Sequence, residues 1–153
     1  MITLSAEQAG QAIGLPRLLA SVQGVGIDSR SLRPGDLFVA LRGENFDGHD
    51  YVEAAFSAGA SGAVVEQTAW QKSSAQTNPQ TNPAIGPVYE VADSLRALGR
   101  LAREVRRMSG AMVFAVTGSA GKTSTKDLLK AMVARTGPVV ATAGNQNNQV
   151  GVP

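Results

Sequence analysis

The chain has 153 residues, a formal net charge of +2 and no cysteine. It contains no run near the roughly 18 uninterrupted apolar residues that a membrane span requires, and the lack of cysteine excludes disulfides and thiolate metal sites. The small charge, and seven aromatic residues (one Trp, two Tyr, four Phe) not interleaved with basic ones, argue against a nucleic-acid partner. We expect a cytoplasmic protein that is not exported, with no membrane span and with a monomer favoured.

The first part of the sequence predicts short helices and strands. Ser5 and Gln8 form a capping-box pattern, which predicts a helix over residues 5–13. A brief strand is predicted at the start of 24–30, and a second strand over 37–41 follows a Pro-Gly turn. We expect these two strands to form a hairpin-like unit.

A polar, glycine-punctuated loop, residues 42–50, follows the second predicted strand. Apolar spacing then predicts a helix over 51–58, and a third strand is predicted over 62–66. Residues 71–87 are rich in Ser, Thr, Asn, Gln and Pro, so we expect a flexible surface loop there, before a strand at 88–91. Residues 1–91 thus predict a small mixed α/β N-terminal domain.

A long amphipathic helix is predicted next, and Asp93 or Ser94 can cap it. One face is apolar, and another carries the basic stripe Arg96, Arg100, Arg103 and Arg107. This stripe could contact an anionic ligand, but a solvated helix face is the favoured interpretation. We place the helix at the beginning of a second domain, residues 92–153.

The most informative stretch is Val113-Phe-Ala-Val-Thr-Gly-Ser-Ala-Gly-Lys-Thr-Ser-Thr125. It predicts an apolar strand, a glycine-bearing turn and a helix that begins near Gly121, which is the arrangement of a phosphate-binding loop (P-loop). The motif is the short Gly-x-x-Gly-Lys-Thr form, because Val116 stands where the longer form has glycine. The alternative is an ordinary surface turn.

The P-loop interpretation assigns a role to each residue of the turn. Backbone N–H groups would surround the phosphates of ATP, Lys122 would act as the catalytic cation on the β- and γ-phosphates, and the hydroxyl of Thr123 would bind Mg²⁺. The candidate phosphate-binding residues are Gly118, Ser119, Ala120, Gly121, Lys122, Thr123 and Ser124. ATP and Mg²⁺ are therefore the expected cofactors.

The second predicted domain begins with two parallel strands. A helix with Leu128, Leu129, Met132 and Val133 facing inward would connect the P-loop strand to a strand over 139–142. Two strands do not make a stable parallel sheet alone, because such sheets need both faces covered. We therefore expect the chain to be the N-terminal part of a longer enzyme, ending at the beginning of a P-loop parallel-sheet domain.

Three segments together resemble the Mur ligases of peptidoglycan synthesis. They are Asp28-Ser-Arg30 with Pro34-Gly-Asp-Leu-Phe-Val-Ala-Leu41 and Asp47-Gly-His-Asp50, then Thr117-Gly-Ser-Ala-Gly-Lys-Thr-Ser-Thr-Lys126, and finally Gly144-Asn-Gln-Asn-Asn-Gln-Val-Gly-Val-Pro153. The P-loop and the Asn-Asn ending are most similar to those of the member that adds D-alanyl-D-alanine. One departure is Gln149, where an acidic residue is common in relatives.

The resemblance implies a first domain that holds the uridine diphosphate end of the substrate. The matching positions are Ser29, Arg30, Asp47, Gly48 and His49, together with Asn145, Asn147 and Asn148 further along. Other interpretations stay open: Arg30 could pair with Asp28 or Asp36, His49 could be a surface cap, and the asparagines could belong to an ordinary turn.

The resemblance also implies ATP-dependent amide ligation. The substrates would be UDP-N-acetylmuramoyl-tripeptide and D-alanyl-D-alanine, joined through an acyl phosphate. Two alternatives remain: the related ligase that adds a diamino acid as the third residue, and a P-loop module that binds a nucleotide and catalyses nothing. We expect residues 1–153 alone to be inactive.

Overall fold

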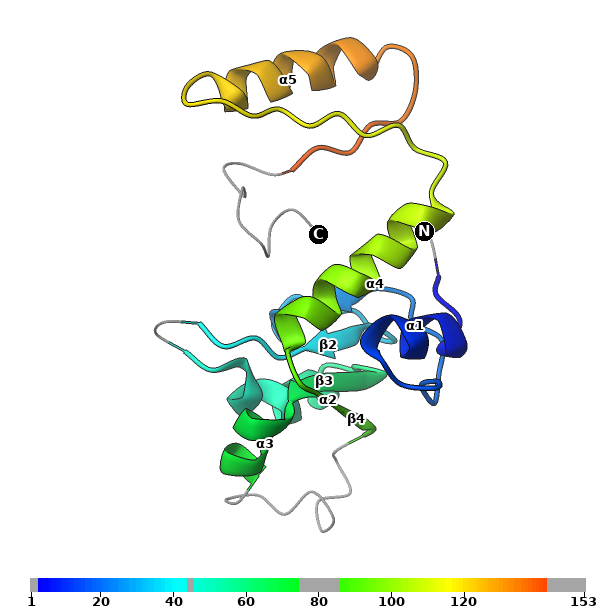
Figure 1. The fold of residues 1–153 in the computed structure, drawn as a ribbon, viewed down its shortest axis with the longest axis vertical. Coiled ribbons are helices and arrows are strands. Elements are labelled where there is room, and N and C mark those ends of the chain that lie inside the picture. The colour runs from blue at the N-terminus through cyan, green and yellow to red at the C-terminus, as the bar shows by residue number, and fades with distance from the viewer. Residues whose placement is uncertain (1–2, 44–45, 75–85, 143–153) are drawn as a thin grey trace. The chain divides into compact units, whose positions relative to one another are not determined.

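A computed structural model describes residues 3–43, 46–74 and 86–142. The chain forms two compact units, Met1–Ser109 and Gly110–Pro153 (Figure 1). None of the helices in the described ranges combines the length and the apolar character needed to cross a bilayer.

The first unit is built on a parallel sheet of four strands. These are β1 (Val25–Gly26), β2 (Leu37–Val39), β3 (Gly62–Glu66) and β4 (Val88–Val91), and they lie in the order β1-β2-β3-β4. Every neighbouring pair is parallel, so all four strands end at the same edge of the sheet. The predicted α/β class and the strands at 62–66 and 88–91 are confirmed.

The predicted hairpin of the first two strands is wrong. β1 and β2 are parallel, with Val25 opposite Leu37. Between them the chain turns twice: the Ser31 N–H donates to the Asp28 carbonyl, and the Asp36 N–H donates to the Arg33 carbonyl. Each turn was visible in the sequence. A single turn would have made β2 antiparallel to β1, but two successive turns make it parallel.

Helices cover both faces of this sheet. α1 (Ala6–Ile13) and α4 (Ser94–Met108) pack on each other at one face, and η1 (Gly48–Tyr51), α2 (Val52–Ser57) and α3 (Gln67–Ser74) lie at the other (Figure 1). Strand side chains alternate between the faces. One resulting core cluster contains Phe38, Ala40, Val52, Ala55, Ala63, Val65 and Trp70.

Two boundaries differ from those expected from composition. α3 includes residues 71–74, the start of the segment predicted as a loop, because Ala69 and the large side chain of Trp70 are buried against the sheet. Residues 75–85 lie outside the described ranges. The first unit also continues past residue 91 to Ser109, since α4 packs on α1.

The second unit contains the helix α5 (Lys122–Val133). The strands predicted at 113–117 and 139–142 are not formed, since the described residues of this unit have no strand ladder. The side chains predicted to face inward from α5 are not buried either: Leu128 is 67% and Met132 69% exposed.

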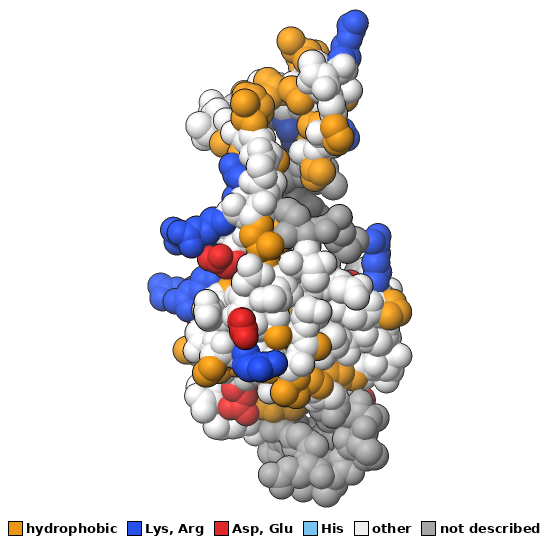
Figure 2. Space-filling model, turned by 90° about the vertical axis from the view of Figure 1, so that its right-hand side faces the viewer, with side chains coloured by type: hydrophobic (Ala, Val, Ile, Leu, Met, Phe, Trp, Pro, Cys, Tyr) orange, Lys and Arg blue, Asp and Glu red, His pale blue; other side chains and the backbone are white. Residues whose placement is uncertain are grey.

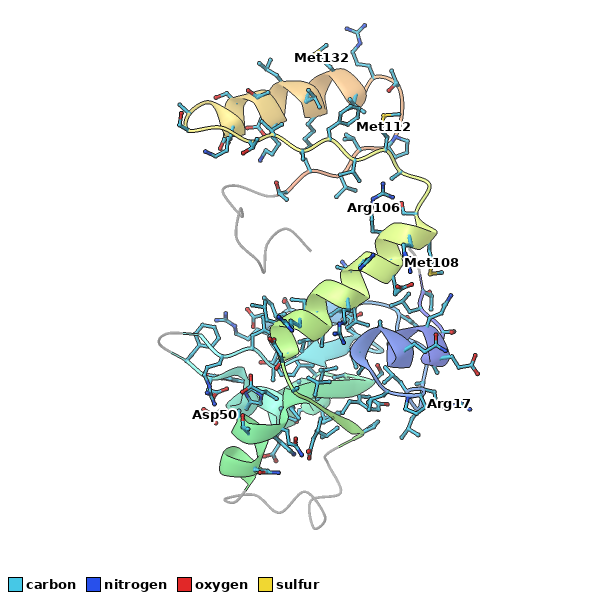
Figure 3. All side chains as sticks on the ribbon, viewed as in Figure 1. Arg17, Asp50, Arg106, Met108, Met112 and Met132 are labelled. Carbon is cyan, nitrogen blue, oxygen red and sulfur yellow. The ribbon has the colours of Figure 1, made fainter. Side chains whose placement is uncertain are left out.

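Apolar side chains are exposed along the rest of this unit as well. Met112, Val113, Phe114 and Val140 are all more than half exposed, and hydrophobic side chains lie at its surface in the upper part of Figure 2. Met112 and Met132 are labelled in Figure 3. A parallel ladder needs covered faces, and the described residues of this unit supply no cover, which accounts for the missing strands.

Candidate functional site

The first candidate loop follows β1 and is organised by Asp28. The Asp28 carboxylate accepts hydrogen bonds from the backbone N–H of Arg30 at 3.0 Å and from the guanidinium at 2.9 Å (Nε) and 2.7 Å (Nη2). The guanidinium and backbone hydrogen bonds from Arg30 lower the pKa of Asp28 to about 2. The alternative that Arg30 pairs with Asp28 is therefore realised here, and Ser29 lies in the same turn.

The second candidate loop follows β2 and leads into η1. Asp47 caps this helix, because its Oδ1 accepts a hydrogen bond from the His49 N–H at 3.0 Å. The same oxygen contacts His49 Nδ1, and its Oδ2 accepts a hydrogen bond from Arg42 Nε at 3.2 Å. Partial burial raises the pKa of the Asp47 carboxyl, but the hydrogen bonds from His49 and Arg42 outweigh it, so the net shift is downward.

His49 is buried, with a residue exposure of 2%. Its Nε2 accepts the backbone N–H of Glu66 at 2.9 Å, so Nδ1 carries the proton that is donated to Asp47. The ring thus connects the second loop to the end of β3. Its predicted contact with a UDP substrate stays a prediction, and the alternative of a surface cap does not fit this burial.

Gly48 allows the second loop to approach β2 closely. Its N–H donates to the Leu41 carbonyl at 2.8 Å. A Cβ at this position would lie 2.7 Å from both the backbone N and O of Leu41, closer than real Cβ contacts occur. Only glycine therefore fits here without a backbone shift.

The two loops lie at one edge of the sheet. They follow the carboxyl ends of β1 and β2, which are neighbouring parallel strands, and ligands collect at such edges. The Asp28 carboxylate, through its hydrogen bonds and its charge, is the main cause of the raised pKa of Arg30 in the first loop. Asp50 of η1 is labelled in Figure 3.

In the second unit the predicted glycine-bearing turn and the helix after it are formed, whereas the predicted strand before them is not. Gly118 and Gly121 have φ of 151° and 76°, in the region that favours glycine, and Gly121 is the N-cap of α5. The first hydrogen bond of the helix runs from the Thr125 N–H to the Gly121 carbonyl, so earlier N–H groups precede its internal ladder. Lys122 extends back over the turn, where its Nζ donates to the Gly118 carbonyl.

The turn suits the triphosphate of a nucleotide. Apart from its chain neighbours, no described residue has an atom within 4 Å of a Cβ position at Gly121. The dipole of the helix favours an anion at this N-terminus. Thr123 offers a hydroxyl oxygen in the first turn of α5, a hard ligand of the kind Mg²⁺ prefers. In the described ranges no three side chains of His, Cys, Asp or Glu are grouped as metal ligands.

Other candidate residues lie elsewhere. Asn145, Asn147 and Asn148 are outside the described residues. A cavity of about 330 Å³ lies between the end of α1 and the start of α4, and none of the predicted site residues lines it. Arg100 lines this cavity near Gly14, the left-handed C-cap of α1, where a cation stabilises a helix end.

Sequence reasoning missed Arg42 and Glu66, which the structure joins to the second loop. A basic residue directly after a strand was a usable signal for Arg42. The contribution of Glu66 is its backbone N–H, for which a sequence carries no signal.

Comparison with known proteins identifies the family. Residues 21–106 match the Mur ligase family, catalytic domain, and residues 116–153 match the Mur ligase middle domain. The chain belongs to the Mur ligase family. The first of these matches covers more than half of the sequence, and the two lie in the order that the sequence motifs predicted.

Curated members of the Mur ligase family resemble the chain closely. It is 42% identical over 132 residues to the UDP-N-acetylmuramoyl-tripeptide–D-alanyl-D-alanine ligase of Bacillus subtilis, covering 86% of this chain and 27% of that protein. The enzyme of the same name from Escherichia coli is 40% identical, and the match covers 87% of this chain and 26% of that protein. The chain thus spans about a quarter of the length of these relatives.

Solved Mur ligase structures are also similar to this chain. MurF from Acinetobacter baumannii superposes with a TM-score of 0.79 at 32% identity, over 99% of this chain and 32% of that one. MurF ligase from Thermotoga maritima, solved in complex with ADP, superposes with a TM-score of 0.68 at 31% identity. This match covers 86% of this chain and 28% of that one. The expected family and fold are confirmed.

Proposed function

We propose that the chain is part of an ATP-dependent ligase that adds D-alanyl-D-alanine to UDP-N-acetylmuramoyl-tripeptide in the cytoplasm. The observation that carries this proposal is the identity of 40–42%, over most of the chain, to two relatives named for that reaction. Neither of these two relatives is named for the diamino-acid reaction or as a non-catalytic module.

Each unit would bind a different substrate. In the first unit the loops after β1 and β2 would hold the UDP end of the substrate, with Ser29, Arg30, Asp47 and Gly48 at the sheet edge and His49 acting through Asp47. In the second unit the turn from Gly118 to Ser124 would hold the phosphates of ATP. Asn145, Asn147 and Asn148 stay proposed contacts of the sugar-diphosphate or the peptide.

The proposed reaction has two steps. A carboxylate oxygen of the tripeptide attacks the γ-phosphorus, and the bond to the β,γ-bridging oxygen breaks to release ADP and leave an acyl phosphate. The amine of D-alanyl-D-alanine then attacks the acyl carbon, loses a proton and displaces phosphate, which forms the amide. Carboxylate and triphosphate repel each other, so cationic groups at the γ-phosphate are required.

Lys122 and Thr123 are the residues of this chain suited to that task. Lys122 already lies across the turn, and exchanging the neutral Gly118 carbonyl for an anionic phosphate oxygen would pair its ammonium with an opposite charge. Thr123 would supply one oxygen to Mg²⁺, which when bound neutralises phosphate charge. No further Mg²⁺ ligand is assigned.

The protein expressed from the complete gene tests the proposed function. Phosphate release is measured with Mg-ATP and a panel of pairs: UDP-N-acetylmuramoyl-tripeptide with D-alanyl-D-alanine, and UDP-N-acetylmuramoyl-dipeptide with diamino acids. We expect turnover and a UDP-pentapeptide product with the first pair alone. Turnover with a diamino acid would replace the proposal by the related ligase, and no turnover with any pair would favour a binding module.

A further inference from the structure

Arg42 is an exposed arginine whose guanidinium is anchored to the second loop. Its side chain is 52% exposed, yet Nε donates to Asp47 Oδ2 at 3.2 Å. Residues 42 and 47 also form an antiparallel bridge, and the Gly43 N–H donates to the Phe46 carbonyl at 2.9 Å. The base of the guanidinium is therefore tied to a short, closed loop at the carboxyl end of β2.

The anchor of Arg42 continues into the core. Asp47 is held by two contacts from His49, which is buried and accepts the Glu66 N–H at the end of β3. A chain of hydrogen bonds thus runs from β3 through a buried ring to an exposed cation. Such an anchor reduces the side-chain entropy that Arg42 would lose on binding a ligand.

The two arginines at this edge of the sheet differ in which guanidinium nitrogens already have a hydrogen-bond partner. Arg30 uses both Nε and Nη2 on Asp28, whereas Arg42 uses only Nε on Asp47. Among the residues that the structure describes, the two terminal nitrogens of Arg42 have no hydrogen-bond partner. A guanidinium presents these nitrogens as a planar fork that matches two phosphate oxygens.

We propose that Arg42 binds the diphosphate of the UDP end of the substrate, with Asp47 and His49 as its positioning residues. This inference rests on the proposed function and assigns to Arg42 a role that the sequence motifs had not given it. Only Nε of the guanidinium is used on Asp47, so the two terminal nitrogens can donate to an anion.

The test compares three ligands that share a base and differ in phosphate: uridine, UMP and UDP. The 153-residue chain and its Arg42→Ala variant are titrated by NMR chemical-shift changes, which suit weak binding. Loss of one or two hydrogen bonds to a charged group predicts an affinity for UDP about tenfold or more lower in the variant. Uridine should bind both proteins equally, because the fork contacts phosphate only.

Two further variants sharpen this result. Arg103→Ala removes an exposed cation of α4 and should leave all three affinities unchanged. Arg42→Lys keeps the charge but lacks the fork, so it should restore only part of the affinity for UDP. An equal loss for uridine and UDP would show a merely structural role and overturn the inference.

The outcomes also separate this inference from the proposed function. If UDP binds the parent and Arg42→Ala equally, Arg42 is not a phosphate ligand, and the proposed function stands. If UDP binds neither protein, the UDP-binding role of the first unit fails, and the inference falls with it.

Discussion

Gly48 sets the geometry of the second loop at the scale of single residues. A Cβ there would meet the Leu41 backbone, so Gly48→Ala should lower the free energy of unfolding by about 1–3 kcal/mol. Gly99 of α4 is the matched control: outside its own helix backbone, no described residue has an atom within 4 Å of its Cβ position, and Gly99→Ala should raise that free energy by roughly 0.5–1 kcal/mol. Urea denaturation measures both variants. Equal effects would contradict the close approach at Gly48.

The Asp28–Arg30 pair predicts a pH dependence. The pKa of Asp28 falls from 3.8 to about 2 in the folded chain, so its contribution to stability is present above pH 3.8 and is lost as the pH falls toward 2. Carboxyl NMR titration should show this low value, and Arg30→Ala should return it toward 3.8. Arg33→Ala, a nearby exposed cation, should leave it unchanged. An Asp28 that titrates near 3.8 in the parent would disprove the pair.

The resemblance to the Mur ligases named Asp47, Gly48 and His49 as candidate residues, and their contact with a substrate stays a prediction. A sequence does not show which way a side chain points. The buried ring of His49 accepts the N–H of Glu66, 17 residues away, and this contact forms only when β3 ends beside η1. The coupling of Arg42 to Asp47 likewise depends on the folded loop.

Helix caps control the elements that flank the sheet. The Asp93 side chain accepts the Arg96 N–H at 2.8 Å and so caps α4, which packs on α1. Asp93→Ala should cost about 1 kcal/mol of unfolding free energy, whereas Asp93→Asn should cost much less, because asparagine caps equally well. Thermal unfolding measures both. Equal losses would instead assign the effect to the exposed 3.7 Å contact with Arg96.

Elements defined by local signals were predictable from the sequence. The capping box of Ser5 and Gln8 is present as predicted, and α1 begins at Ala6. The pairing of β1 and β2 was predicted wrongly, because two successive turns, each visible in the sequence, leave β2 parallel to β1. α3 was missed because polar composition hid the burial of Trp70.

At the scale of the whole molecule, the two units differ in how much core they have. The first unit has helices on both faces of its sheet, whereas the described part of the second has exposed apolar side chains and no buried residue on α5. We therefore predict that hydrogen exchange is slow in β2 and β3 and fast throughout α5. Equal protection of α5 and β3 would contradict this difference.

The central claim is that one chain carries a UDP-substrate unit followed by a nucleotide-phosphate unit. Calorimetric titration of the 153-residue chain with UDP-N-acetylmuramoyl-tripeptide and, separately, with Mg-ATP tests it most directly. We predict that both bind, that Arg30→Ala weakens only the first, and that Lys122→Ala weakens only the second. Binding of Mg-ATP alone, with no effect of Arg30→Ala on either titration, would contradict the substrate-binding role of the first unit.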